Sequence, residues 1–160
     1  MVTAAGAQVA VAGGGAYLYL RRYVKNIDYA VLGACLYTFS GFTVYNVFFN
    51  HFVDVVALFP YLLWSLDEAL YNDRRSWFAF WVAVNLVNNY FFFIGQVVFL
   101  PIYFICKLTT KDFPMNVRLF VRLAFESLLG AALGFVLLWP AVLSILQNPR
   151  TIDLSSAGAF

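Results

Sequence analysis

The sequence predicts an all-α membrane protein, a polytopic bundle of about six transmembrane helices. Of its 160 residues, 63% are hydrophobic and 11% are charged, and the mean hydropathy is +0.79. A soluble domain carries about 25% charged and about 45–50% apolar residues. The apolar runs are continuous and do not alternate with a period of two, which favours helices over the strands of a transmembrane barrel. In lipid, a helix satisfies its backbone hydrogen-bonding groups within its own segment.

The apolar runs divide the chain, in order, into six expected spans of a single transmembrane domain. The spans lie near residues 3–20, 29–45, 53–70, 77–88, 91–106 and 121–146 of the 1–160 chain. The first span has Gly6, Ala10 and Gly14 at intervals of four, and the last contains Gly130 and Gly134. This spacing of small residues allows helices to approach closely, so we interpret it as packing.

Other residues inside the spans also have structural explanations. Pro60 and Pro101 lie within the third and fifth spans, where neighbouring helices can compensate for a kink. Arg122 and Glu126 are four residues apart near the start of the last span, which is the spacing of an ion pair on one helix face. Since charged groups inside membranes are often functional, a role for Glu126 is the alternative.

Residues 77–106 could form one long helix or two short helices with a turn at Asn88, Asn89 and Tyr90. Lys and Arg collect on the cytoplasmic side of short loops. The residues to be placed are Arg21, Arg22, Lys25, Arg74, Arg75, Lys107, Lys111, Arg118 and Arg122. With a turn at Asn88, all nine lie on one side and Arg150 alone lies on the other. The sequence therefore predicts six spans with both termini outside.

This hairpin places polar residues at the outer end of the bundle. Each of its arms is about 22 Å long, less than the roughly 30 Å of the hydrocarbon core. The turn is therefore expected below the outer surface, where irregular backbone must pack against protein or line a hydrated cavity. The polar stretch at residues 40–54 falls at the same end. We expect an outward-facing, partly hydrated cavity there.

Within this cavity, His51 and Asp54 are three residues apart and share a face if the third helix begins by residue 51. The functional interpretation is a site for a phosphorylated or hydroxylated substrate, with Asp54 as acid, base or metal ligand and His51 on the phosphate. The structural interpretation is that both are solvated at the interface and that Asp54 favours the positive end of a helix dipole. One His and one Asp make a poor metal site, so no metal is predicted.

Four stretches carry a family resemblance along nearly the whole chain. They are LYTFSGF at 36–42, NHFVDVVALFPYLLWSLDEAL at 50–70, VNNYFFFIGQVVFLPIYFICKL at 87–108 and GFVLLWPAVLSILQNPR at 134–150. In this order they resemble the YfhO family, which consists of bacterial multispanning proteins similar to GT-C type glycosyltransferases. Members are several times longer and begin with a span and a large outer loop that carries the principal catalytic acid. The chain is therefore expected to be an internal or N-terminally truncated fragment.

The resemblance implies a GT-C-like fold that transfers a sugar from a polyprenyl-phosphate carrier to an envelope polymer such as teichoic acid, at the outer face of the bacterial cytoplasmic membrane. Asn50, His51 and Asp54 match the family's N-H-F-x-D-like stretch, and Asn89 and Tyr90 match its N-Y stretch. Asp54 and His51 are the expected catalytic residues. Asn50, Asn89, Tyr90 and Arg150 are the expected substrate-binding residues, with Arg150 or His51 assisting the leaving phosphate.

The expected partners are membrane lipid, the lipid-linked sugar donor and the polymer acceptor, with no further cofactor. Basic residues are sparse and lie at membrane edges, so the chain has no footprint for nucleic acid. Two alternatives to a piece of a glycosyltransferase remain. One is a transporter or lipid-handling scaffold, which needs the same helices but no positioned acid. The other is a truncated remnant without activity of its own. The oligomeric state is left open.

Overall fold

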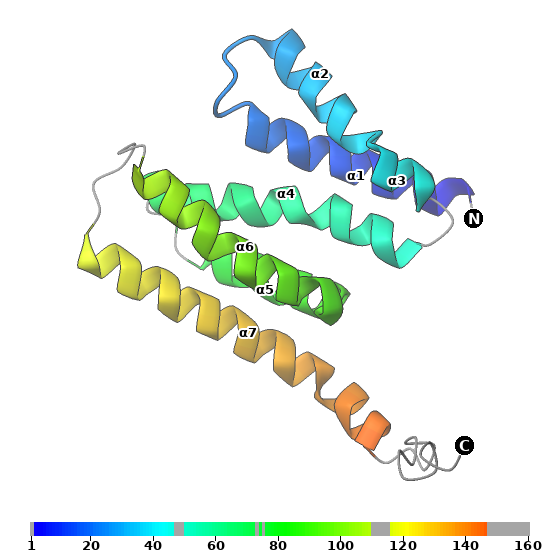
Figure 1. Ribbon diagram of the computed structural model, residues 1–160. Helices are drawn as coiled ribbons and strands as arrows, with labels where there is room; N and C mark the ends of the chain where they lie inside the picture. Colours follow the sequence, from blue (N-terminus) through cyan, green and yellow to red (C-terminus); the bar gives the residue numbers. More distant parts are fainter. Residues whose placement is uncertain (1, 47–49, 73, 75, 110–115, 147–160) are drawn as a thin grey trace, which may run out of the picture.

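The computed structural model describes residues 2–46, 50–72, 74, 76–109 and 116–146, and side chains within these ranges except at 2–5, 50–51 and 145–146. All regular structure in these ranges is helical, which confirms the predicted all-α class (Figure 1). The helices are α1 (Val2–Leu20), α2 (Ile27–Thr38), α3 (Gly41–Tyr45), α4 (Asn50–Tyr71), α5 (Trp77–Asn88), α6 (Tyr90–Thr109) and α7 (Val117–Leu146).

Five of the six expected spans each correspond to one helix, and the second divides into α2 and α3. At this break Thr38 donates its hydroxyl to the Ala34 carbonyl over 2.7 Å, and the Ser40 hydroxyl lies 3.2 Å from that of Thr43. Short hydroxyl side chains offer local hydrogen bonds that compete with a continuous helix. This break was not predicted, although the hydroxyl residues in LYTFSGF were the signal for it.

Three stretches among the described residues are long and apolar enough to cross a membrane: Ile27–Tyr45, Tyr90–Thr109 and Val117–Ser144. The first of these consists of α2 and α3 together. The helix α5 is apolar but has only 12 residues, a length of about 18 Å. This agrees with the short first arm expected from the hairpin.

The chain reverses at Asn89, because α5 ends at Asn88 and α6 begins at Tyr90. The predicted two-helix hairpin is therefore confirmed. The start of α1 and the far end of α7 lie at the same end of the bundle (Figure 1). The described Lys and Arg residues follow α1 and α4 or lie in the last turn of α6 and the first turns of α7, at the other end. We call this the basic end; that it faces the cytoplasm remains a prediction.

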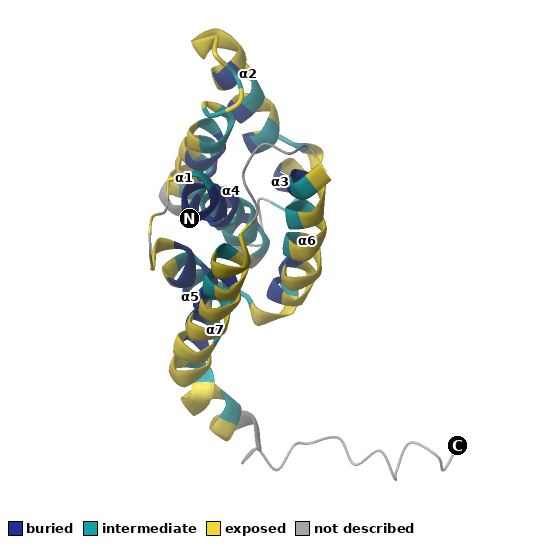
Figure 2. Ribbon diagram, turned by 90° about the vertical axis from the view of Figure 1, so that its left-hand side faces the viewer, coloured by how far each residue is buried: buried dark blue, intermediate teal, exposed yellow. Residues whose placement is uncertain are grey.

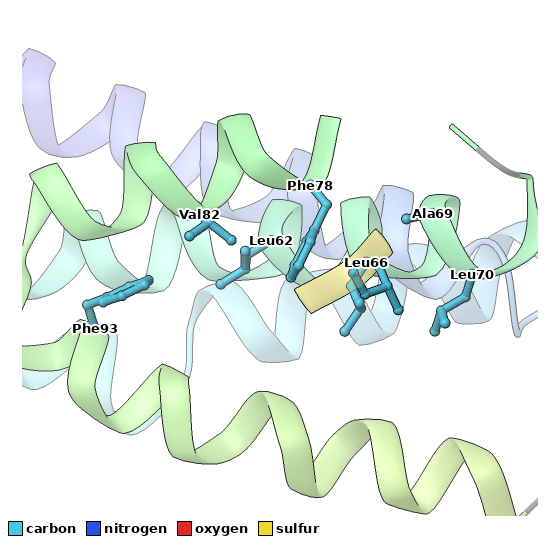
Figure 3. Packing of buried hydrophobic residues seen from close by; sticks show 8 residues of the cluster. Leu62, Leu66, Ala69, Leu70, Phe78, Val82 and Phe93 are labelled. Atoms are coloured by element: carbon cyan, nitrogen blue, oxygen red, sulfur yellow. The ribbon is translucent and has the colours of Figure 1, made fainter. Parts of the chain in front are cut away.

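The helix α4 forms the centre of the bundle, packed between α1 and α5, while α7 packs on α5. Figure 2 shows buried residues concentrated on α4 and on its neighbours α1 and α5, whereas most of α7 is exposed. The apolar core combines side chains from four helices (Figure 3). Its members are Leu62, Leu66, Ala69, Leu70, Phe78, Val82, Phe93 and Leu123.

Glycines allow the closest helix contacts. A Cβ added at Gly130 would meet the Ala79 backbone oxygen and would lie 2.7 Å from the Val82 Cβ, so α7 approaches α5 directly at this point. On α1, a Cβ at Gly15 would lie 2.6 Å from the Tyr61 ring of α4. Helix packing, which we predicted for the glycine pair of the last span, is confirmed at Gly130.

Tyr37 explains how α4 accommodates its internal proline. Pro60 has no N–H to donate to the carbonyl one turn earlier, at Val56. The Tyr37 hydroxyl of α2 donates to that Val56 oxygen over 2.8 Å. A neighbouring helix therefore supplies the missing hydrogen bond, as is required in lipid.

Candidate functional site

Asp54 lies near the start of α4, is partly buried and faces α1. Gln8 of α1 donates its side-chain Nε2 to the Asp54 Oδ1 over 2.6 Å. Gln8 was not predicted as a partner of Asp54, because the contact depends on how α1 and α4 pack. The contact gives Asp54 a structural role beside any chemical one.

This contact belongs to a polar seam along the whole α1–α4 interface. Asp54, Tyr61 and Glu68 are seven residues apart in turn and thus share one face of α4. The Tyr61 hydroxyl donates to the Val11 carbonyl over 3.1 Å. Near the basic end, Arg22 forms an ion pair with Glu68. We call the contacts that Asp54, Tyr61 and Glu68 make with α1 and the loop after it the α1–α4 seam.

Asn89 caps the start of α6. Its Oδ1 accepts a hydrogen bond of 3.3 Å from the Phe92 backbone N–H, as expected of an asparagine that precedes a helix. Tyr90, the first residue of α6, is 63% exposed. The hairpin turn is thus held by its own asparagine, while the Tyr90 ring is available to lipid or to a ligand.

The structure places Asp54 and Asn89 at the same end of the bundle but on different sides of α4. Phe52 packs its ring against Phe92 of α6, with centroids 5.4 Å apart. Residues two apart on a helix point in nearly opposite directions, so Asp54 faces α1 while Phe52 faces α6. The side chains of Asn50 and His51 lie outside the described residues, as does Arg150. Their roles remain predictions.

A second polar group lies at the basic end and was not predicted. Its centre is Asp67 of α4, which is fully buried. Tyr103 of α6 donates its hydroxyl to the Asp67 Oδ1 over 2.9 Å, and Tyr23 donates to the Oδ2. Lys107 of α6 donates to the Tyr23 hydroxyl. We call Tyr23, Asp67, Tyr103 and Lys107 the inner cluster.

Aromatic rings surround the ammonium group of the inner cluster. The Lys107 Nζ lies 4.1 Å from the ring centroid of Tyr23, 5.4 Å from that of Tyr103 and 5.6 Å from that of Tyr71. Such distances allow cation–π attraction, which is strongest when the cation is desolvated. Burial raises the pKa of the Tyr23 phenol, in the loop after α1, above its usual 10.0, and the hydrogen bond to Asp67 raises it further. Tyr23 therefore remains a neutral donor at physiological pH.

Ion pairs extend from the inner cluster to the surface. Besides Arg22, Glu68 pairs with Arg74, whose Nε lies 3.3 Å from the Glu68 Oε2. On α7, the Arg122 Nε lies 3.9 Å from the Glu126 Oε1, which confirms the predicted ion pair. Arg122 also donates to the Ala69 carbonyl over 2.6 Å and so joins α7 to α4.

An apolar groove of about 620 Å³ lies between α6 and α7, with α4 and α5 forming its floor. Its lining is apolar apart from Ser127 and runs from Phe93 and Ala131 to Leu108 and Phe120. Because both walls belong to candidate membrane spans, the groove is suited to a hydrocarbon chain. Within the ranges that the structure describes, no three His, Cys, Asp or Glu side chains converge, and we assign no metal ligand.

Comparison with known proteins identifies the family of this chain. The sequence model of the family described as bacterial membrane protein YfhO matches residues 5–157. The chain belongs to the YfhO family. It is 27% identical over 128 residues to the Bacillus subtilis (strain 168) protein named uncharacterized protein YfhO, and the match covers 71% of this chain and 14% of that relative. No solved structure matches the chain.

The inner cluster of this YfhO-family chain could have been found from spacing. Tyr103 and Lys107 are four residues apart at the end of one span, so they lie on one helix face. Tyr23 follows shortly after the end of another span. A carboxylate inside a third apolar run was the remaining signal, since ionisable groups in spans are paired or functional.

Proposed function

We propose that this YfhO-family chain forms part of a glycosyltransferase of the bacterial cytoplasmic membrane. The enzyme takes a sugar from a polyprenyl-phosphate carrier and transfers it to an envelope polymer such as teichoic acid at the outer face. The chain spans 14% of its curated relative, so the activity is proposed for a protein that also contains the remaining spans and loops. The resemblance to GT-C type enzymes suggests the reaction.

The apolar groove between α6 and α7 is the observation that carries this proposal. A polyprenyl carrier has a long hydrocarbon chain and needs a surface that accepts it from the bilayer. The groove holds about 620 Å³ and opens between two candidate spans. Its wall on α6 begins with Phe93, one turn after the Asn89 cap. The hydrocarbon chain would lie in the groove and the sugar phosphate would lie beyond it, near the hairpin turn.

The chemistry would be completed at that end of the bundle. Asp54 would act as a general acid or base, and His51 with Arg150 would stabilise the charge that develops on the leaving phosphate. Asn50, Asn89 and Tyr90 would contact the sugar or the carrier phosphate. The principal acid of the family would come from the outer loop that precedes this part of a full-length protein.

The test is photolabelling with a polyprenyl-phosphate sugar that carries a diazirine on its hydrocarbon chain. Wild-type chain in nanodiscs should be labelled on α6 and α7. The variant Ala131→Trp fills the groove wall and should reduce labelling about tenfold, equivalent to about 1.4 kcal/mol. Its neighbour Ala132 is exposed and outside the lining, so Ala132→Trp is the matched control. Equal labelling of both variants would contradict the assignment of the groove.

A lipid-handling or transport scaffold is the second candidate, and the direction of Asp54 favours it. Asp54 hydrogen-bonds to Gln8 of α1, on the side of α4 away from α6 and the groove. A scaffold needs the groove but no acid beside it. Labelling of the groove, combined with a full-length protein that moves the lipid across vesicles but transfers no sugar, would support this candidate.

A further inference from the structure

The helix α6 packs apolar side chains on the core but buries few residues fully. Its buried residues are Phe93, Gln96 and Lys107, so two of the three are polar. Its outward face is exposed along most of its length (Figure 2). By contrast, α1 packs closely on α4, and α7 packs closely on α5.

Cavities flank α6 on both sides. The apolar groove separates it from α7. A smaller cavity of about 290 Å³ lies between α6, α4 and α2 and is lined by residues that include Tyr37, Phe59 and Phe99. Aromatic side chains bridge this second space, as the rings of Phe59 and Phe99 meet edge to face at 5.4 Å. The helix therefore has free volume on either side into which it can shift.

Polar contacts hold α6 at two levels. In its outer half, Gln96 donates to the Asn85 Oδ1 of α5 over 3.2 Å, in a fully buried pair. At the basic end, Tyr103 donates to Asp67, and Lys107 is held by Tyr23. The Tyr103 hydroxyl also lies 3.0 Å from that of Tyr19. The inner cluster thus joins α6 to both α1 and α4.

The membrane environment makes these polar contacts decisive for where α6 sits. Lipid chains are as apolar as leucine, so apolar contacts between spans give little net preference over contacts with lipid. Asp67 is fully buried in α4, and a buried carboxylate that loses a hydrogen-bond donor carries an uncompensated desolvation cost, so it favours the position of α6 that keeps Tyr103 close. The geometry of the inner cluster, more than the fit of apolar side chains, therefore fixes the basic end of α6.

We propose that the inner cluster is a latch that holds the basic end of α6 against α4 and so sets the width of the groove between α6 and α7. With the Asp67–Tyr103 contact made, the groove has the width described here. When that contact is broken, the basic end of α6 moves away from α1 and α4, and the groove changes shape. The consequence for the donor chain rests on the proposed function, but the latch itself does not.

Distances between spin labels test the latch without any activity assay. Cys106 of α6 is free and exposed and provides one label, and Lys25→Cys in the loop after α1 provides the other, in a Cys35→Ser chain reconstituted in nanodiscs. We expect Asp67→Leu, which removes the acceptor, and Tyr103→Phe, which removes the donor, to lengthen the mean distance by about 2 Å, the scale of helix shifts in switching proteins, and to broaden its distribution. Tyr29→Phe, at an exposed tyrosine of α2, is the matched control.

The variants also separate a latch from a general loss of structure. Tyr103→Phe removes one hydroxyl and keeps the ring, so it decides the result if Asp67→Leu fails to fold. A label pair at Cys106 and Phe125→Cys, an exposed position of α7, should show a matching change across the groove. Distances that stay at wild-type values in Tyr103→Phe would overturn the latch. A changed distance with unchanged photolabelling by the polyprenyl probe would keep the latch and contradict the proposed donor site.

Discussion

The contact of α7 with α5 at Gly130 makes a quantitative prediction. A Cβ at this position would lie 2.7 Å from the Val82 Cβ, which is 0.7 Å short of the 3.4 Å at which ordinary contact begins, and it would also meet the Ala79 backbone oxygen. Backbone cannot rotate away as a flexible side chain can, so Gly130→Ala must push the two helices apart. Overpacking of this kind costs about 1–3 kcal/mol.

Gly95 of α6 provides the matched control, since a Cβ there meets nothing within 4 Å. Replacing a helical glycine by alanine alone contributes about 0.5–1 kcal/mol of stability, and this contribution is common to both variants. The difference between Gly130→Ala and Gly95→Ala therefore isolates the overpacking, about 1–3 kcal/mol. SDS-induced unfolding in mixed micelles, followed by circular dichroism, measures it. Equal stability of the two variants would refute the close α5–α7 contact.

Three further predictions concern the hairpin, the candidate site and the proline in α4. Asn89→Cys should react with a membrane-impermeant thiol reagent from the outer face; reaction from the cytoplasmic face alone would contradict the predicted orientation. In a full-length family member, Asp54→Asn and His51→Ala should lower sugar transfer by about 10²-fold, as for loss of a general acid or base, with unchanged membrane insertion; wild-type transfer by both would eliminate the site. Tyr37→Phe should lose about 1 kcal/mol of stability in the same unfolding assay, whereas Tyr29→Phe should lose none.

The fold could be predicted from the sequence to the extent that lipid constrains it. Apolar runs gave the helices to within a few residues, and the distribution of Lys and Arg gave the turn at Asn89. The first signal is local in the sequence, and the second depends only on the side of the membrane on which a loop lies. The break between α2 and α3 was not predicted, because Thr38 and Ser40 are isolated hydroxyl residues in a run whose mean hydropathy still suits a membrane span.

The polar partners could not be predicted in the same way, because they join helices that are distant in the chain. Gln8 meets Asp54, and Tyr103 meets Asp67 thirty-six residues away. Spacing shows which residues share a face of one helix, but not which helix that face meets. The structure brings Asp54 and Asn89 to the same end of the bundle, as expected, while the Gln8 partner of Asp54 came only from packing; that this end holds a functional site stays a prediction.

The α1–α4 seam determines how the Asp54 variants should be interpreted. On α4, Asp54, Tyr61 and Glu68 recur every seven residues and so share one face, and they contact Gln8 and Val11 of α1 and Arg22 in the loop after it. An asparagine at 54 still offers Oδ1 to the Gln8 amide, so Asp54→Asn removes the charge and keeps the hydrogen bond to Gln8. Asp54→Leu removes the charge and the hydrogen bond. If Asp54→Asn loses sugar transfer but keeps its stability, Asp54 has a catalytic role. If Asp54→Asn transfers sugar normally while Asp54→Leu unfolds, Asp54 has only a structural role.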